Sequence, residues 1–112
     1  MTPLTKVYLL DDEGQRFFGD GPCRLLKLTE ETGSLRKAAA EMGMAYTKAM
    51  KLLKQAEQAV GKSLTERVIG GAKGGGSRLT EAGKELVKRY EIYKARCLQM
   101  GGELYQEVFA GF

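Results

Sequence analysis

The segment GSLRKAAAEMGMAYTKAMKLLKQAEQAVG, residues 33–61, decides the fold. Ser34 is suited to cap a helix, because its hydroxyl can accept a hydrogen bond from a backbone N–H of the first turn. Gly43, just after Met42, permits an abrupt change of chain direction. The apolar residues between them have the i, i+3, i+4, i+7 spacing of one buried helical face: Leu35, Ala38, Ala39 and Met42.

A second helix is expected from near Ala45 to Val60, with Gly61 as its C-terminal stop. A short helix, a glycine turn and an amphipathic helix with a basic outer face describe a helix-turn-helix, whose second helix lies in the major groove of DNA. The core side of this second helix is apolar: Ala45, Ala49, Leu52, Leu53, Ala56 and Val60. Its other side is cationic and amide-bearing: Thr47, Lys48, Lys51, Lys54, Gln55 and Gln58.

A hairpin and a helix are predicted before this motif. Residues 4–18 combine β-forming side chains with the turn signal DDEG, so we expect a β-hairpin there. The first helix should run from about Pro22 to Thr32, capped by Asp20 or Gly21, and stop at Gly33. Its buried residues would be Leu25, Leu26 and Leu28.

A wing is predicted after the motif, over residues 63–79. Residues 63–69 alternate weakly between apolar and polar side chains, and 77–79 would form a short return strand. Between them, five of the seven residues 70–76 are glycine, which predicts a flexible turn whose backbone approaches another group closely.

A long helix is expected to follow, with Thr80 as its cap and Glu81 in its first turn. A helix from Glu81 to about Ala110 would be roughly 45 Å long, more than so small a domain can cover, so part of its apolar stripe should pack against a second subunit. Gly101 and Gly102 predict a kink or a break. The expected dimer residues are Leu86, Val87, Tyr90, Tyr93, Cys97, Leu98, Leu104, Tyr105, Val108 and Phe109.

The predicted fold class is therefore mostly α with a small β component. The 112 residues suit one compact unit, in which 1–80 form a winged helix-turn-helix, with the helix-turn-helix at 34–60, and 81–112 form the dimerisation helix.

Charge is distributed unevenly along the chain. Residues 34–78 carry nine cations against three acids, a local net charge of +6, while the remainder carries −2. Such a positive middle suits a polyanionic partner, and its alternative interpretation is a solvated surface.

Several other classes of protein are disfavoured. Histidine is absent, which excludes His-based metal sites and Ser-His-Asp or Cys-His catalysis. Cys23 and Cys97 lack CxxC spacing, and we expect both to be small apolar residues that fill space in the fold. We therefore expect no enzyme activity, no metal and no cofactor. The segment GAKGGGS has glycine where a nucleotide-binding loop needs lysine, and Lys73 comes too early. No apolar run approaches the roughly 18 residues of a membrane span, and no signal peptide is recognisable, so we expect a cytoplasmic protein without a membrane partner.

Residues 33–86 resemble the winged helix-turn-helix of two families. The pattern GSL..AA..MGM, followed by L.ER..GG and LTEAG, is similar to both LysR-type regulators and ModE, the molybdate-responsive regulators. GMAYTKAMKLL and GGAKGGGSRLTEAG are more similar to ModE. About half of the chain is covered, with the motifs in the right order and at the right intervals.

This resemblance implies a homodimer that binds an inverted-repeat operator, with the helix after LTEAG mediating dimerisation. In ModE, oxyanion sensing resides in additional C-terminal domains; this sequence ends at Phe112 without them, so the resemblance does not carry molybdate binding over to it, and whether an oxyanion is sensed stays open. Ala45 is a departure, because these families often place a capping serine there.

The leading candidates for contact with bases are Tyr46, Thr47 and Lys48, in the exposed first turn of the second helix. Lysine can reach guanine acceptors, and threonine offers its hydroxyl, or its methyl to thymine. Two roles are open to Tyr46: contact with DNA, or packing against Met50. Lys51, one turn further on, and Lys54 are expected to meet phosphates.

The remaining candidates are expected at the DNA backbone. Ser34, Arg36 and Lys37 begin the preceding helix, where free N–H groups and cations favour phosphate; the alternative is a routine cap beside solvated charges. Lys73 and Arg78 bracket the wing glycines, and Lys73 is expected to reach phosphate or the minor groove. Arg67 is a candidate for pairing with an acid of the scaffold.

The sequence thus predicts a homodimeric, sequence-specific transcriptional regulator that binds double-stranded DNA. RNA polymerase or an effector protein as a further partner stays open. A second class also stays open, a protein-interaction module that uses its basic face or the aromatic segment Tyr105, Phe109 and Phe112.

Overall fold

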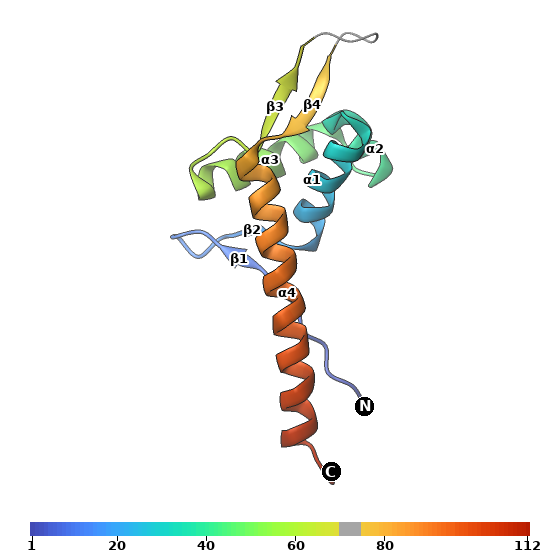
Figure 1. The fold of residues 1–112 in the computed structure, drawn as a ribbon, viewed down its shortest axis with the longest axis vertical. Coiled ribbons are helices and arrows are strands. Elements are labelled where there is room, and N and C mark those ends of the chain that lie inside the picture. The colour runs from blue at the N-terminus through green and yellow to red at the C-terminus, as the bar shows by residue number, and fades with distance from the viewer. Residues whose placement is uncertain (70–74) are drawn as a thin grey trace.

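A computed structural model describes residues 1–69 and 75–112. It is mostly α-helical with two small antiparallel hairpins, as predicted, and has the form of a winged helix-turn-helix (Figure 1). The described residues extend over 62 × 28 × 24 Å, because the last helix projects well beyond the globular part. The elements are β1 (Leu9–Leu10), β2 (Arg16–Phe18), α1 (Asp20–Thr32), α2 (Leu35–Glu41), α3 (Tyr46–Val60), β3 (Thr65–Val68), β4 (Gly76–Leu79) and α4 (Glu81–Val108).

The helix-turn-helix forms as its caps predict. Ser34 Oγ accepts a hydrogen bond of 3.1 Å from the backbone N–H of Lys37, which begins α2. Gly43 has φ +66°, a left-handed conformation that glycine adopts readily, and the chain turns there into α3. The small side chains between the two helices are buried and let their backbones approach closely: Ala38, Ala39, Ala49 and Ala56.

The wing is fastened to the body by backbone hydrogen bonds. β3 and β4 pair from Thr65↔Leu79 to Val68↔Gly76. The N–H of Ser77 donates to the carbonyl of Gly33 at 2.7 Å, and the N–H of Leu79 donates to Glu30 Oε2 at 2.7 Å. The base of the wing is therefore fixed to α1, beside the start of α2.

The core collects apolar side chains from α1 to α4 and from β2. Phe18, Leu25 and Leu64 are at most 2% exposed. Tyr90 of α4 lies edge-on to Phe18 with ring centroids 5.1 Å apart, and its hydroxyl lies 2.9 Å from the carbonyl oxygen of Val7. Through Tyr90, α4 belongs to the protomer core for its first three turns.

The first part of the chain differs in several details from the prediction. The hairpin is shorter than residues 4–18, because pairing is limited to Leu9↔Phe18 and Leu10↔Arg16. α1 begins at Asp20 with Gly19 as its cap rather than near Pro22. Leu25 and Leu26 are buried as expected, but Leu28 only partly.

Ala45 is exposed rather than buried, because it is the N-cap of α3 and not part of its apolar stripe. It provides no side-chain cap, which agrees with the missing serine.

The predicted break of α4 at Gly101–Gly102 is wrong. The helix is continuous from Glu81 to Val108, and the N-terminal segment runs beside it (Figure 1). A Cβ on Gly101 would lie 3.1 Å from Thr5 Oγ1, and the Tyr105 hydroxyl donates to the Met1 carbonyl at 2.9 Å. Gly101 thus gives room to the N-terminal segment instead of ending the helix.

Two buried groups predict a loss of stability at alkaline pH. Burial raises the pKa of the Cys23 thiol from 9.0 to about 11 and that of the Tyr90 hydroxyl from 10.0 to about 12. Both bind their proton more tightly in the folded chain, so their contribution to the unfolding free energy is fully present below pH about 9 and is lost as the pH rises toward 12.

Urea unfolding between pH 7 and 11 measures this loss. Tyr90→Phe should be less stable at pH 7 by about 1 kcal/mol, because its hydrogen bonds are gone, and its stability should fall less steeply above pH 10. An unchanged slope in the variant would contradict the assignment to Tyr90.

Candidate nucleic-acid interface

The outer face of α3 is a cationic, solvent-exposed surface. Thr47, Lys48 and Lys51 are exposed, as are Gln55 and Gln58. Their position follows from the helical period, since Ala49, Leu53 and Ala56 point the opposite side of α3 into the core. Lys54 is also exposed, and its Nζ lies 3.8 Å from Glu57 Oε1, so its charge is partly compensated.

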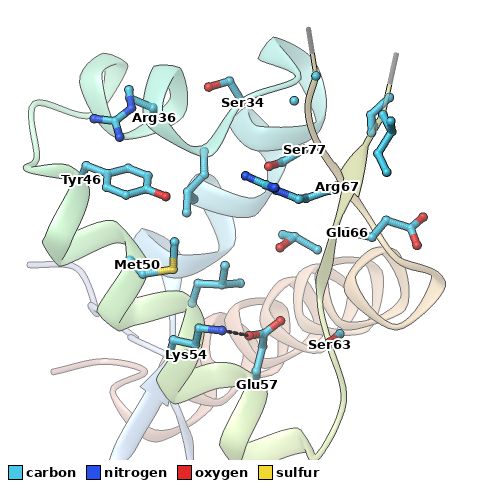
Figure 2. Close-up of a pocket in the computed structure, with 17 residues that line it drawn as sticks. Ser34, Arg36, Tyr46, Met50, Lys54, Glu57, Ser63, Glu66, Arg67 and Ser77 are labelled. Atoms are coloured by element: carbon cyan, nitrogen blue, oxygen red, sulfur yellow. Dashed lines mark ion pairs between the residues drawn. The ribbon is translucent and has the colours of Figure 1, made fainter.

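A cleft of about 890 Å³ separates α3 from the wing (Figure 2). The start of α2 closes one end, with Ser34 and Arg36. Tyr46 and Met50 form the wall along α3, and Arg67 and Ser77 form the wall along the wing. The cleft thus joins three elements of the motif and holds basic, hydroxyl and apolar side chains together.

Arg36 and Tyr46 form a stacked pair in this cleft. The guanidinium carbon of Arg36 lies 4.1 Å from the centre of the Tyr46 ring, a cation–π contact between the first turns of α2 and α3. Tyr46 is half-buried rather than fully exposed, and it lies between Arg36 and Met50 in Figure 2. Sequence analysis named both residues but had no signal for their contact, since ten positions separate them.

The two arginines of the described wing are placed differently from the prediction. Arg78 is paired with Glu66, with Nε 2.8 Å from Oε1, directly across the two strands. Arg67, the candidate for such a pair, instead points into the cleft beside Ser77 (Figure 2). The pairing register of β3 and β4 places Arg78 opposite Glu66 and Arg67 opposite Ser77. The glycine-rich sequence between the strands gave no indication of this register.

Three other candidates have simpler placements. The Ser34 hydroxyl is occupied as the cap of α2, and Lys37 is exposed. Lys73 lies outside the described residues, so the structure assigns it no position.

The predicted dimer residues divide into two groups. Val87 and Tyr90 are 8% and 3% exposed, so they belong to the core of the chain and not to a surface available to a partner. Leu86 packs against that core, and the Tyr105 hydroxyl donates a hydrogen bond to the N-terminal segment. The exposed members are Tyr93, Leu98, Leu104, Val108 and Phe109, with Cys97 half-buried.

Two exposed apolar residues of α4, Ile92 and Met100, were not predicted from the sequence, and Met100 completes a stripe. Met100 is 66% exposed and lies between Cys97 and Leu104 at helical spacing. We call the stripe the α4 apolar face, which consists of Tyr93, Cys97, Met100, Leu104 and Val108.

The described residues contain no cluster of three or more potential metal ligands. Cys23 and Cys97 are both free thiols. No helix in residues 1–69 or 75–112 is both long and apolar enough to span a membrane.

Residues 23–84 match the family described as "Bacterial regulatory helix-turn-helix protein, lysR family". This match takes in most of α1, the complete helix-turn-helix, the wing and the start of α4. The chain belongs to this family. The cationic face of α3 is therefore the outer face of the second helix in a lysR-family helix-turn-helix, the element that enters DNA in this class of motif.

The relatives include ModE proteins, as the motifs predicted. The chain is 38% identical over 104 residues to the molybdenum transport protein ModE of Herbaspirillum seropedicae, and this alignment covers 87% of the chain and 37% of the relative. It is 35% identical over 80 residues to the DNA-binding transcriptional dual regulator ModE of Escherichia coli K12, covering 70% and 30%. It is 28% identical over 102 residues to the molybdenum-pterin-binding protein MopA of Rhodobacter capsulatus, covering 91% and 38%. The chain thus spans well under half the length of these relatives.

Proposed function

We propose that this chain is a DNA-binding transcriptional regulator that acts as a homodimer on an inverted-repeat operator. α3 enters the major groove, and the wing, with its glycine-rich segment 70–76, lies on the backbone or in the minor groove. The exposed cationic face of α3 beside the cleft is the observation that carries this proposal.

The charges of α3 and the cleft favour a nucleic acid over other polyanions. Thr47 and Lys48 protrude from the first turn of a helix whose other side is buried, the geometry by which such a helix presents side chains to base edges. Lys51 lies one turn behind, and Arg36 and Arg67 face the cleft, where a sugar–phosphate strand fits beside α3. Displacement of counterions by these cations would supply most of the affinity.

The α4 apolar face supports the homodimer, and the charges beside it support an antiparallel arrangement. Arg89, Arg96 and Glu103 follow one another at seven-residue intervals along one edge of the face, and Glu107 lies one turn beyond. Arg89 also pairs with Glu85 within the helix, with Nε 2.7 Å from Oε1. In an antiparallel pair, the basic half of this edge meets the acidic half of the partner's edge. Two-fold symmetry of this kind presents two α3 helices to an operator with matching symmetry.

A gel-shift experiment with random genomic fragments at two salt concentrations tests the proposed function. A subset of fragments should be retained at low salt, and retention should fall steeply at the higher concentration, because counterions are released on binding. Failure to retain any fragment at low salt would contradict DNA binding.

A more specific prediction concerns Lys48. Lys48→Ala should lower the preference for a selected operator over a random duplex about tenfold, because a contact with a base edge is lost. Lys51→Ala, its control on the same face, should weaken both duplexes alike, because a phosphate contact carries no sequence information. Both affinities are measured by fluorescence anisotropy at one fixed salt concentration. Equal losses on the two duplexes for Lys48→Ala would refute its role in specificity.

One observation favours the alternative, a protein-interaction module. Tyr105 and Phe109 stack with centroids 5.1 Å apart, and Phe112, at 94% exposure, lies 6.0 Å from Phe109. Exposed aromatic side chains of this kind are enriched where proteins bind one another. The gel-shift experiment distinguishes the two functions, since this alternative predicts no retained fragment.

A further inference from the structure

The contact with the Tyr46 ring holds the guanidinium of Arg36 in place without using its hydrogen-bond donors. In a cation–π contact the flat face of the guanidinium rests on the ring, while its N–H groups lie in the guanidinium plane and point outward. The guanidinium carbon of Arg36 lies over the Tyr46 ring, 4.1 Å from its centre. The stacked arginine therefore keeps its donors available for a ligand.

The charge of this arginine is also uncompensated within the part of the chain that the structure describes. The ion pairs in this part of the chain involve cations other than Arg36, including Lys54 with Glu57 and Arg78 with Glu66. Arg36 is exposed, and it lines the cleft together with Tyr46, the residue that precedes the exposed Thr47 and Lys48 in the chain. An ordered, exposed and unpaired guanidinium at this place is suited to bind a phosphate oxygen in a bidentate manner.

We propose that Arg36, held on the ring of Tyr46, binds a backbone phosphate of the DNA strand that enters the cleft between α3 and the wing. Tyr46 is then a positioning residue, which acts through Arg36 and makes no base contact of its own. The inference rests on the proposed function, and it assigns one phosphate contact and its support to two named side chains.

The chain contains a matched control for this pair. Arg16 of β2 stacks on Tyr8 with its guanidinium carbon 4.2 Å from the ring centre, almost the same geometry. This second pair belongs to the N-terminal hairpin, and neither of its residues lines the cleft. Arg16→Gln and Arg36→Gln therefore remove the same charge and the same type of contact from two different places.

Binding to a short duplex of mixed sequence is sufficient for the test, because a phosphate contact does not depend on sequence. Arg36→Gln should weaken binding about tenfold at low salt and reduce the slope of log K against log salt by about one. Arg16→Gln should leave the slope unchanged. Equal effects of the two variants would overturn the inference.

A double-mutant cycle tests the role of Tyr46. Tyr46→Leu should weaken binding about threefold in the wild-type background and have no effect in the Arg36→Gln background, whereas Tyr46→Phe keeps the ring and should bind like wild type. Equal losses from Tyr46→Leu in both backgrounds, or a loss from Tyr46→Phe, would show that Tyr46 acts on its own. Thermal unfolding of each variant checks that the fold is kept.

The failure of this inference is distinguishable from failure of the proposed function. If wild-type protein binds the duplex but the two arginine variants behave alike, only the assignment to Arg36 and Tyr46 is lost. If wild-type protein binds no duplex at low salt, both are refuted.

Discussion

A Gly83→Ala variant is expected to unfold about 8 °C below the wild-type protein, a loss of about 2 kcal/mol. Gly83 lies in the first turn of α4, directly against the backbone of Leu64. A Cβ at this position would lie 2.2 Å from the Leu64 carbonyl oxygen and 3.1 Å from its carbonyl carbon. An added methyl group therefore meets backbone atoms rather than the end of a flexible side chain.

The backbone around Leu64 has little freedom to move away. Leu64 is fully buried, its N–H donates to Glu57 Oε2 at 2.8 Å, and its carbonyl accepts from the N–H of Thr80 at 3.0 Å. Relief of the clash requires that α4 move away from this segment, which weakens the bond to Thr80 and the attachment of the wing. The cost of overpacking is expected to outweigh the gain in helix propensity from alanine.

Gly102→Ala is the matched control, because it makes the same substitution in the same helix. A Cβ on Gly102 meets nothing within 4 Å, so this variant should gain up to about 1 kcal/mol from helix propensity. Both variants are compared by circular dichroism at one protein concentration, since the proposed dimerisation would make the midpoint depend on concentration. Similar melting temperatures for the two would contradict close packing at Gly83.

The second large effect is expected on dimerisation. Met100→Glu should weaken the dimer by about 100-fold or more, because Met100 lies in the middle of the α4 apolar face. In the proposed antiparallel dimer, the region near Met100 would lie close to the two-fold axis, so the two introduced carboxylates would also repel each other. Operator binding should weaken with the dimer, because one protomer contacts only one half-site.

Gln106→Glu adds the same charge on the opposite side of α4 and should leave the dimer intact. Sedimentation equilibrium over a range of protein concentrations measures both dissociation constants. If Met100→Glu dimerises as tightly as Gln106→Glu, the dimer does not use this face.

The helix-turn-helix could be predicted because its determinants are local. The Ser34 cap, the alanines at helical spacing and the glycine turn at Gly43 lie within a few residues of the contacts they make. The wing was also recognisable, because a glycine-rich turn between two short β-forming segments has few other interpretations.

The structural roles of several glycines could not be predicted from the sequence. Gly101 and Gly102 predicted a break, yet α4 continues, because one glycine accommodates the N-terminal segment and the other is tolerated. Gly76, the last residue of the glycine-rich stretch of the sequence, packs closely against another segment: a Cβ there would lie 2.2 Å from the carbonyl oxygen of Gly33. Such approaches between segments far apart in sequence depend on tertiary structure.

The candidate site was predicted as a face but not as a cleft. Helical period alone placed Thr47, Lys48 and Lys51 on the exposed side of α3. The stacking of Arg36 on Tyr46 and the orientation of Arg67 depend on how α2 and the wing pack beside α3, which no local pattern encodes.

The central claim is that DNA binds the face formed by α3 and its cleft with the wing. The most direct measurement is a titration of ¹⁵N-labelled protein with a short duplex at low salt, followed by amide chemical shifts. The largest changes are expected in residues 34–37 and 46–54 and in β3 and β4. Changes confined to the N-terminal hairpin or to the last turns of α4, with α3 unaffected, would contradict the claim.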